Sequence, residues 1–304
     1  MRPCAKFLTA ISRLCRVTAV VVAVTTCSTF ALRASVNTSA AAQSKPTLEQ
    51  LLGRLDAYLL EYETQLSSVV ADERFEQSLW GFGAKSLFRT ATLESEVAFM
   101  RLPGGAEWLG FRDVKRVNWK AAKPSGTSIA DVLSSSAGDL TKAREIAKAS
   151  SRHNLGLPRT INVPTAPLEI IHPLHRGAHH YKLLADDSVR GTRTVVIGFE
   201  ETGRPALLRD GRTGENLVSR GRVWLAPASG TVWRVEWLYE IEDRPVNSLT
   251  PKLRVEFEAN KTLGIMVPTS MTENFAEQGG RGEGRASYSN FRRFGTSARI
   301  VPQP

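Results

Sequence analysis

Four of the five histidines of this 304-residue chain lie in one short stretch, EIIHPLHRGAHHY, residues 169–181. Imidazole and carboxylate groups are metal ligands, and a Glu-x-x-His step on a helix presents two of them on one face. Glu169, His172 and His175 follow this spacing, so they are the candidate metal ligands of the sequence. Pro173 lies between the two histidines and would break or kink the helix that has to align them.

The remaining two histidines of the stretch do not improve the case for a metal. His179 and His180 are adjacent, so in an extended segment their side chains point to opposite faces. The favoured interpretation is therefore a helix exit and a loop that leads into a strand from residue 181, without a metal site. The sequence also has no G-x-S-x-G, H-E-x-x-H or Walker motif, and the glycines of GFGAKS at 81–86 favour a turn. No catalytic residue and no cofactor are predicted.

The first 42 residues have the features of an export signal. Arg and Lys occur there without any acid, and the apolar run Val17–Leu32 is shorter than the roughly 20 residues of a membrane span. Ala40 and Ala42 are the small residues that precede a signal-peptidase cut, which predicts cleavage after Ala42. The alternatives are an uncleaved anchor and a lipid anchor at Cys27. Cleavage predicts a periplasmic or extracellular protein without a transmembrane span.

Charge and cysteine content change once this leader is removed. All three cysteines lie in it, as do five of the 40 Lys and Arg residues and none of the 30 acids, so the net charge falls from +10 to +5. The mature chain can form neither disulfides nor zinc–thiolate sites. Basic and acidic residues alternate, with no run of like charge, so no nucleic-acid partner is predicted.

The mature chain is expected to begin with an amphipathic helix. Thr47 and Gln50 have the spacing of a capping box, and apolar residues recur at helical spacing from Leu48 to Val70. Extended segments follow at 86–102 and 106–119. SIADVLSSS and DLTKAREIAKASSRHN, residues 128–136 and 139–154, predict two short helices, and TAPLEIIHP predicts a third.

From Tyr181 onward the pattern is that of antiparallel strands. Six consecutive strands are expected, with turns near Arg190-Gly191 and at PASG. A long sheet with one dry face must curl and have that face covered. The sequence therefore predicts an α+β fold, a strongly bent antiparallel sheet or incomplete barrel covered by the long first helix and the short central helices. The mature residues 43–304 are expected to form a single domain with a helical insertion at about 120–180.

Aromatic and aliphatic residues on the dry face are the candidate ligand-binding residues. In VWRVEWLYEI they alternate with charged residues, with Leu238 as the exception, and KLRVEFEAN repeats the scheme. These residues could line a groove for an acyl chain, or could pack against the first helix. The candidates are Trp233, Trp237, Tyr239, Val255 and Phe257.

The segments GRVWLAPASGTVWRVEW, LRVEFEANKTLGIMVPTSM and YSNFRRF carry a resemblance. With the leader and the first helix, they resemble the periplasmic lipoprotein-carrier family, the LolA/LolB-like half-barrels, and secreted bacterial proteins of unknown function with the same tail pattern. The resemblance implies an exported, non-enzymatic protein whose partner is an apolar small molecule or a lipidated protein. A structural or protein-interaction module of the cell envelope is the alternative. A metal-dependent hydrolase centred on His172 and His175 is the third hypothesis.

Overall fold

The computed structural model describes residues 45–81, 87–101, 108–134, 139–156, 159–211, 213–242, 250–277 and 280–295. These residues belong to one compact unit of the chain. The predicted leader, residues 1–42, lies outside the described residues. Within the described ranges, no helix combines the length and the hydrophobicity that a membrane crossing requires.

Helix α1 (Leu48–Leu66) begins at the predicted capping box. The Thr47 hydroxyl accepts a hydrogen bond from the Gln50 backbone N–H at 3.2 Å, and the Gln50 side chain accepts one from the Thr47 N–H at 3.0 Å. The predicted extension of the helix to Val69 and Val70 is wrong. Ser68 has a φ of 68°, which turns the chain, and Val69 already belongs to the first strand.

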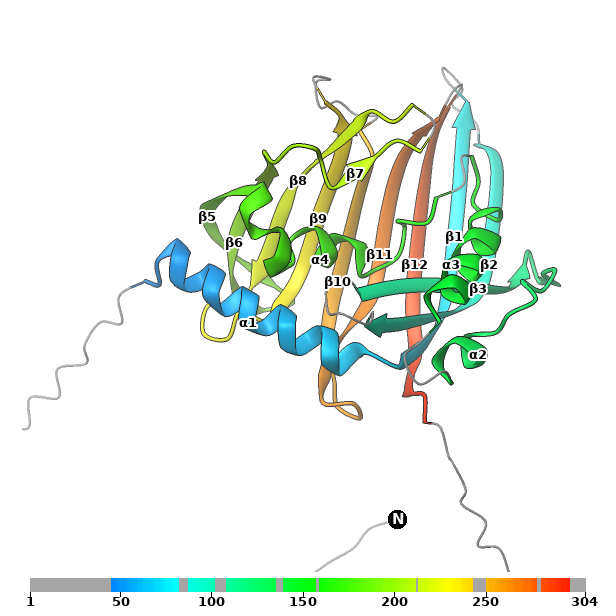
Figure 1. Cartoon of the computed structure of the whole chain (residues 1–304), viewed down its shortest axis with the longest axis horizontal. Helices are drawn as coiled ribbons and strands as arrows, with labels where there is room; N and C mark the ends of the chain where they lie inside the picture. Colours follow the sequence, from blue (N-terminus) through cyan, green and yellow to red (C-terminus); the bar gives the residue numbers. More distant parts are fainter. Residues whose placement is uncertain are drawn as a thin grey trace, which may run out of the picture. The chain divides into compact units, whose positions relative to one another are not determined.

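The sheet of the described residues has twelve strands, all antiparallel to their neighbours, in the order β4-β3-β2-β1-β12-β11-β10-β9-β8-β6-β5, with β7 paired to β8 (Figure 1). It is curled and unclosed, as predicted. Seven long strands follow residue 178, one more than expected. The bounds are β1 Val69–Gly81, β2 Leu87–Arg101, β3 Trp108–Val117, β4 Lys120–Ala121, β5 His179–Val189, β6 Thr192–Glu201, β7 Leu208–Arg209, β8 Asn216–Leu225, β9 Val232–Ile241, β10 Lys252–Asn260, β11 Ile265–Glu277 and β12 Gly280–Arg293.

One face of this sheet, here called the inner face, carries the main core. Ile197, Val223, Val235 and Val255 are direct cross-strand neighbours on β6, β8, β9 and β10, and all four are buried. Leucines of α1 belong to the same core cluster, and α1 lies across the strands on this face (Figure 1). The opposite face is called the outer face.

The central helices cover both faces. Their bounds are α2 Ile129–Leu133, α3 Leu140–Ser151, α4 Ala166–Ile170 and the 3-10 helix η1 Pro173–Ala178. Leu168 of α4 belongs to the core under α1. Helices α2 and α3 instead pack on Ala98 and Phe111, which alternate along β2 and β3 with inner-face residues. The inner face is thus covered by α1, α4 and the irregular chain around α4.

Candidate functional site

Three of the five candidate ligand-binding residues lie deep in the inner-face core. Trp237 is 1% exposed, and Val255 and Phe257 are fully buried. The Phe257 ring meets Tyr62 of α1 edge-on, with ring centroids 6.3 Å apart. This part of the sheet wall therefore contacts the helix that covers it.

The other two candidates are only partly buried. Tyr239 packs on Trp237 with ring centroids 4.9 Å apart. Trp233 occupies a bulge, because Leu225 pairs with Val232 while Trp224 pairs with Arg234. It packs both on the main core and on the outer-face cluster around Trp224.

A narrow crevice runs between this wall and the chain segment that crosses over it. Ile161 and Asn162 form one side, and Trp237, Tyr239 and Leu253 form the other. Lys252 and Glu273 complete the lining, and the space is too narrow for a water molecule. The crevice thus combines apolar walls with a few polar groups, and in this conformation it is closed.

The indole N–H of Trp237 is a buried donor without a partner among the described residues. A buried donor without an acceptor costs about 1–3 kcal/mol. Such groups are rare in native proteins, and an acceptor on a bound molecule would remove this penalty.

A buried ionic network lies next to the crevice. Arg112 of β3 binds Glu73 of β1 through two nitrogens, and its Nη2 also donates to the Asn162 carbonyl at 2.9 Å. Arg159 donates to Glu273 at 2.7 Å and stacks over the Phe275 ring. Burial alone would lower the pKa of Arg112, but the Glu73 carboxylate outweighs it and raises that pKa. The network holds residues 154–156 and 159–162 on the inner face.

These charged residues are not among the site residues predicted from the sequence. A signal was present in the spacing. Glu73, Phe75, Gln77 and Leu79 occupy every second position of β1, and Met271, Glu273 and Phe275 do so on β11. Side chains two residues apart on a strand point to the same face, so these charged residues share the dry face with their apolar neighbours. Their partners come from segments distant in sequence, so the pairing itself was not predictable.

The candidate metal ligands do not converge. His175 Nε2 lies 3.5 Å from Glu169 Oε1, and both side chains are partly exposed. His172 instead turns inward, where its Nε2 lies 3.2 Å from Glu63 Oε2 of α1. Across the described ranges, no group of three His, Cys, Asp or Glu side chains could hold a metal ion.

The other two histidines of the stretch also separate. His179 begins β5 and is buried near Phe199, and burial lowers the pKa of its imidazole. His180 is exposed on the other face of the strand. The four imidazoles therefore occupy four different surroundings, as the alternation of a strand and the break at Pro173 require.

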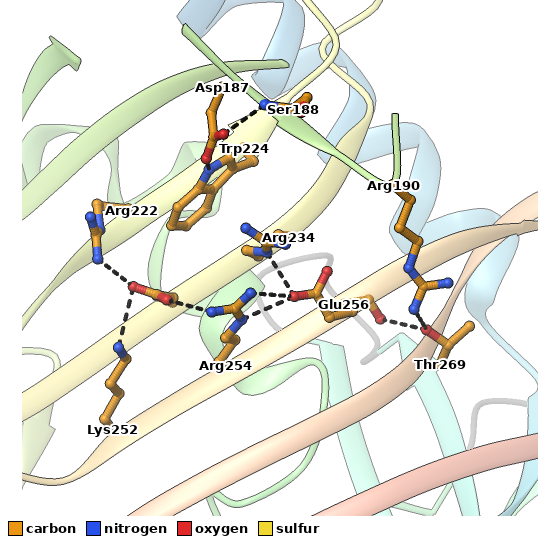
Figure 2. A network of polar contacts seen from close by, with 11 residues as sticks. Asp187, Ser188, Arg190, Arg222, Trp224, Arg234, Lys252, Arg254, Glu256 and Thr269 are labelled. Atoms are coloured by element: carbon orange, nitrogen blue, oxygen red, sulfur yellow. Dashed lines mark hydrogen bonds and ion pairs between the residues drawn. The ribbon is translucent and has the colours of Figure 1, made fainter. Parts of the chain in front are cut away.

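The outer face of β8, β9 and β10 carries a ladder of ion pairs (Figure 2). The carboxylate of Glu236 is near three cations, Arg222 at 2.7 Å, Arg254 at 3.3 Å and Lys252 at 3.4 Å. Arg254 and Arg234 both contact Glu256 as well. This part of the outer face is charged, in contrast to the inner face, although Glu236 itself is only 3% exposed beneath its cations.

No family model matches the sequence, and no curated protein matches it significantly. The chain is similar in structure to a DUF1329 family protein from Desulfovibrio piger, with 14% identity, a TM-score of 0.36, and coverage of 83% of this chain and 95% of that chain. It is also similar to a putative outer membrane lipoprotein-sorting protein domain from Vibrio parahaemolyticus, with 12% identity, a TM-score of 0.35, and coverage of 80% and 92%. A MucA/MucB complex from Pseudomonas aeruginosa matches with 10% identity, a TM-score of 0.20, and coverage of 80% and 99%.

The lipoprotein-sorting domain among these structures agrees with the resemblance to the LolA/LolB-like half-barrels.

Proposed function

We propose that this is an exported, non-enzymatic envelope protein that binds an apolar ligand, a lipid or a lipidated chain, between its sheet and the segments that cover it. The mature chain would begin at residue 43 and fold as a single domain. The observation that carries the proposal is the unsatisfied Trp237 N–H in the wall of a crevice with apolar sides. A ligand with an acyl chain and one carbonyl oxygen fits both features.

The covering layer is of a kind that could open for such a ligand. Opposite Trp237 lies the irregular segment at 159–162, which forms no strand with the sheet. It is held by the hydrogen bond from Arg112 to the Asn162 carbonyl and by the bond from Arg159 to Glu273 of β11. Side-chain contacts of this kind can break without disturbing the backbone ladder of the sheet. Ligand entry would widen the crevice by moving this segment away from Leu253 and Trp237.

The first test uses protein purified after export, without detergent. Mass spectrometry of organic-solvent extracts should detect a co-purified lipid, and N-terminal sequencing should begin at Gln43. A neutral monoacylglycerol, added below its solubility limit, should change the intrinsic tryptophan fluorescence in a saturable way. Absence of both a co-purified lipid and saturable binding would contradict the proposal.

A pair of tryptophan variants locates the site. Trp237→Phe keeps the apolar wall and removes the N–H, so monoacylglycerol binding should weaken about tenfold, the effect of one hydrogen bond. Trp224→Phe is the matched control, because Trp224 lies on the outer face and its Nε1 donates to Asp187 at 2.8 Å. Equal affinities of the two variants would place the ligand elsewhere.

A structural or protein-interaction module of the envelope is the second candidate. Leu60 of α1 and Leu174 of η1 are 47% and 55% exposed, on two elements that contact each other. A contiguous exposed apolar patch marks a protein-docking surface, and these two leucines would belong to such a patch. Co-purification from envelope extracts of a protein partner, lost on Leu60→Gln and accompanied by no lipid, would favour this alternative.

A further inference from the structure

A groove of about 330 Å³ opens on the outer face, where β5, β6, β8 and β9 lie next to each other in the sheet. It is separate from the inner-face crevice, with which it shares no lining residue. Lys182, Glu200, Arg222 and Leu238 line it from the outer face, and Phe199 of the main core also contributes to its lining. Its size lies at the lower end of the range for small-molecule sites.

The groove depends on the glycine of β6. Gly198 is the cross-strand neighbour of Lys182 on β5 and of Arg222 on β8. A Cβ at this position would lie only 3.3 Å from the Lys182 and Leu184 side chains. Because the glycine has none, the Lys182 and Leu184 side chains come this close to the main chain of β6, in the wall of the groove.

The floor of the groove interrupts the charged pattern of the outer face. Leu238 was the single apolar residue on the charged side of β9 in the sequence, and it lines this groove together with Leu184. The cross-strand neighbours of Leu238 are Arg220 and Lys252. Two leucines thus form a small apolar surface inside an ionic surface.

The rim of the groove is cationic. Lys182, Arg220 and Arg222 line it, against the single carboxylate of Glu200. Lys182 has no ion pair within the described ranges, and Arg220 contacts Glu240 while its Nε has no hydrogen-bond partner there. Arg222 shares Glu236 with two further cations, as Figure 2 shows for Arg222, Lys252 and Arg254. The positive charge at the rim is therefore only partly neutralised.

We propose that this groove binds a single-chain anionic amphiphile, a phosphate or carboxylate with a short apolar tail. The anion would contact Lys182 and the guanidinium groups of Arg220 and Arg222, which suit oxyanions in charge and geometry. The tail would lie on Leu184 and Leu238. This site is independent of the inner-face site proposed above.

Calorimetric titration at low ionic strength tests the ligand class. Octyl phosphate, kept below its critical micelle concentration, should bind at one site per chain. Inorganic phosphate lacks the tail and octyl glucoside lacks the charge, so each should bind at least about tenfold more weakly, the factor that 1.4 kcal/mol represents. Equal binding of octyl phosphate and octyl glucoside would overturn the anionic part of the proposal, and equal binding of inorganic phosphate would overturn the amphiphilic part.

Variants locate the site on the outer face. Gly198→Val keeps every charge and fills the hollow, so octyl phosphate binding should be lost. Lys182→Gln should weaken binding several-fold, whereas Lys261→Gln, on the exposed β10–β11 turn, should not. Trp237→Phe changes only the inner face, so this variant should bind octyl phosphate as the wild type does. The outer-face proposal and the proposed function can therefore fail separately.

Two further measurements keep the test decisive. If Gly198→Val does not fold, as judged by thermal unfolding, Leu238→Gln removes the apolar floor instead and should abolish the advantage of octyl phosphate over inorganic phosphate. Sedimentation with phosphatidylglycerol vesicles distinguishes a lipid headgroup from a free amphiphile. Vesicle binding without binding of monomeric octyl phosphate, or normal octyl phosphate binding by Gly198→Val, would overturn the proposal.

Discussion

His172 and Glu63 face each other in the interior, with imidazole Nε2 3.2 Å from carboxylate Oε2 and both side chains at most 2% exposed. The Leu174 N–H donates to the other imidazole nitrogen, Nδ1, at 3.4 Å, and Arg101 Nε lies 3.0 Å from Glu63 Oε1. A histidine from the candidate metal cluster thus connects the 3-10 helix η1 to the covering helix α1.

Replacement of this imidazole should destabilise the fold strongly. His172→Leu removes the imidazole beside the buried Glu63 carboxylate and leaves that carboxylate with Arg101 alone. A buried polar group that loses its neighbour in this way lowers the free energy of unfolding by about 1–3 kcal/mol. His175→Leu, three residues on and partly exposed, should stay within about 0.5 kcal/mol of the wild type. Urea denaturation measures both, and equal stabilities would contradict the structural role of His172.

The contact between α1 and the β8–β9 turn predicts a second difference. Gly230 has a φ of 75°, and a Cβ there would clash with the Arg54 carbonyl of α1. Gly264 has a similar φ of 71° and open space around it. In both Gly→Ala variants an alanine must adopt a left-handed backbone conformation, which lowers the free energy of unfolding by about 1 kcal/mol. Only Gly230→Ala also displaces helix α1. Its thermal midpoint should be clearly the lower of the two, and matching midpoints would contradict this docking of α1.

The tyrosines predict a limit of stability at high pH. Burial raises the pKa of Tyr58, Tyr62, Tyr181, Tyr239 and Tyr288 above the ordinary value of 10, and these are all five tyrosines of the chain. Near pH 10 the native protein should therefore show less phenolate absorbance at 295 nm than the unfolded chain.

The sign of the pH dependence follows from the same shifts. Above pH 10 the unfolded chain loses phenolic protons that the native state keeps, so the free energy of unfolding should fall as the pH rises further. Phenolate absorbance and loss of tertiary circular dichroism should appear together. Tyrosine titration in a protein that is still folded would contradict the burial of these side chains.

The ion pairs of Glu236 on the outer face predict that the free energy of unfolding depends on pH below about pH 4.5. Burial alone would raise the pKa of Glu236, but Lys252, Arg222 and Arg254 outweigh it and lower that pKa below the ordinary value of 4.5. This contribution to stability is present above pH 4.5 and is lost as the pH falls through the lower native pKa.

Glu236→Gln should therefore be less stable than the wild type at neutral pH and should lose less stability below pH 4.5. Glu283→Gln, whose side chain is 43% exposed and 3.9 Å from Arg285, is the matched control and should leave the pH profile unchanged. Urea midpoints at a series of pH values measure the effect, and parallel profiles of all three proteins would refute it.

Local patterns determined much of this fold. The Thr47–Gln50 capping box and the leucines of α1 predicted where the helix starts and which side is buried, because both depend on neighbours within four residues. The alternation of β9 and β10 predicted the dry wall in the same way. The end of α1 was not predictable, since Val69 and Val70 continue the helical spacing and only the pairing of β1 with β2 and β12 makes them a strand.

Tertiary contacts decided what local spacing left open. The first and last long strands of the sheet lie side by side because Phe75 of β1 pairs with Ala286 of β12, more than 200 residues away. Glu169, His172 and His175 have helical spacing in the sequence, yet Pro173 changes the direction of the chain between the two histidines. As a result, His172 contacts Glu63 and His175 contacts Glu169. The sequence by itself determined which face of each element is apolar, because that depends only on the order of side chains along a helix or strand. Only the tertiary structure decided which buried charges meet and where the grooves lie, because those depend on elements that the chain brings together from distant positions.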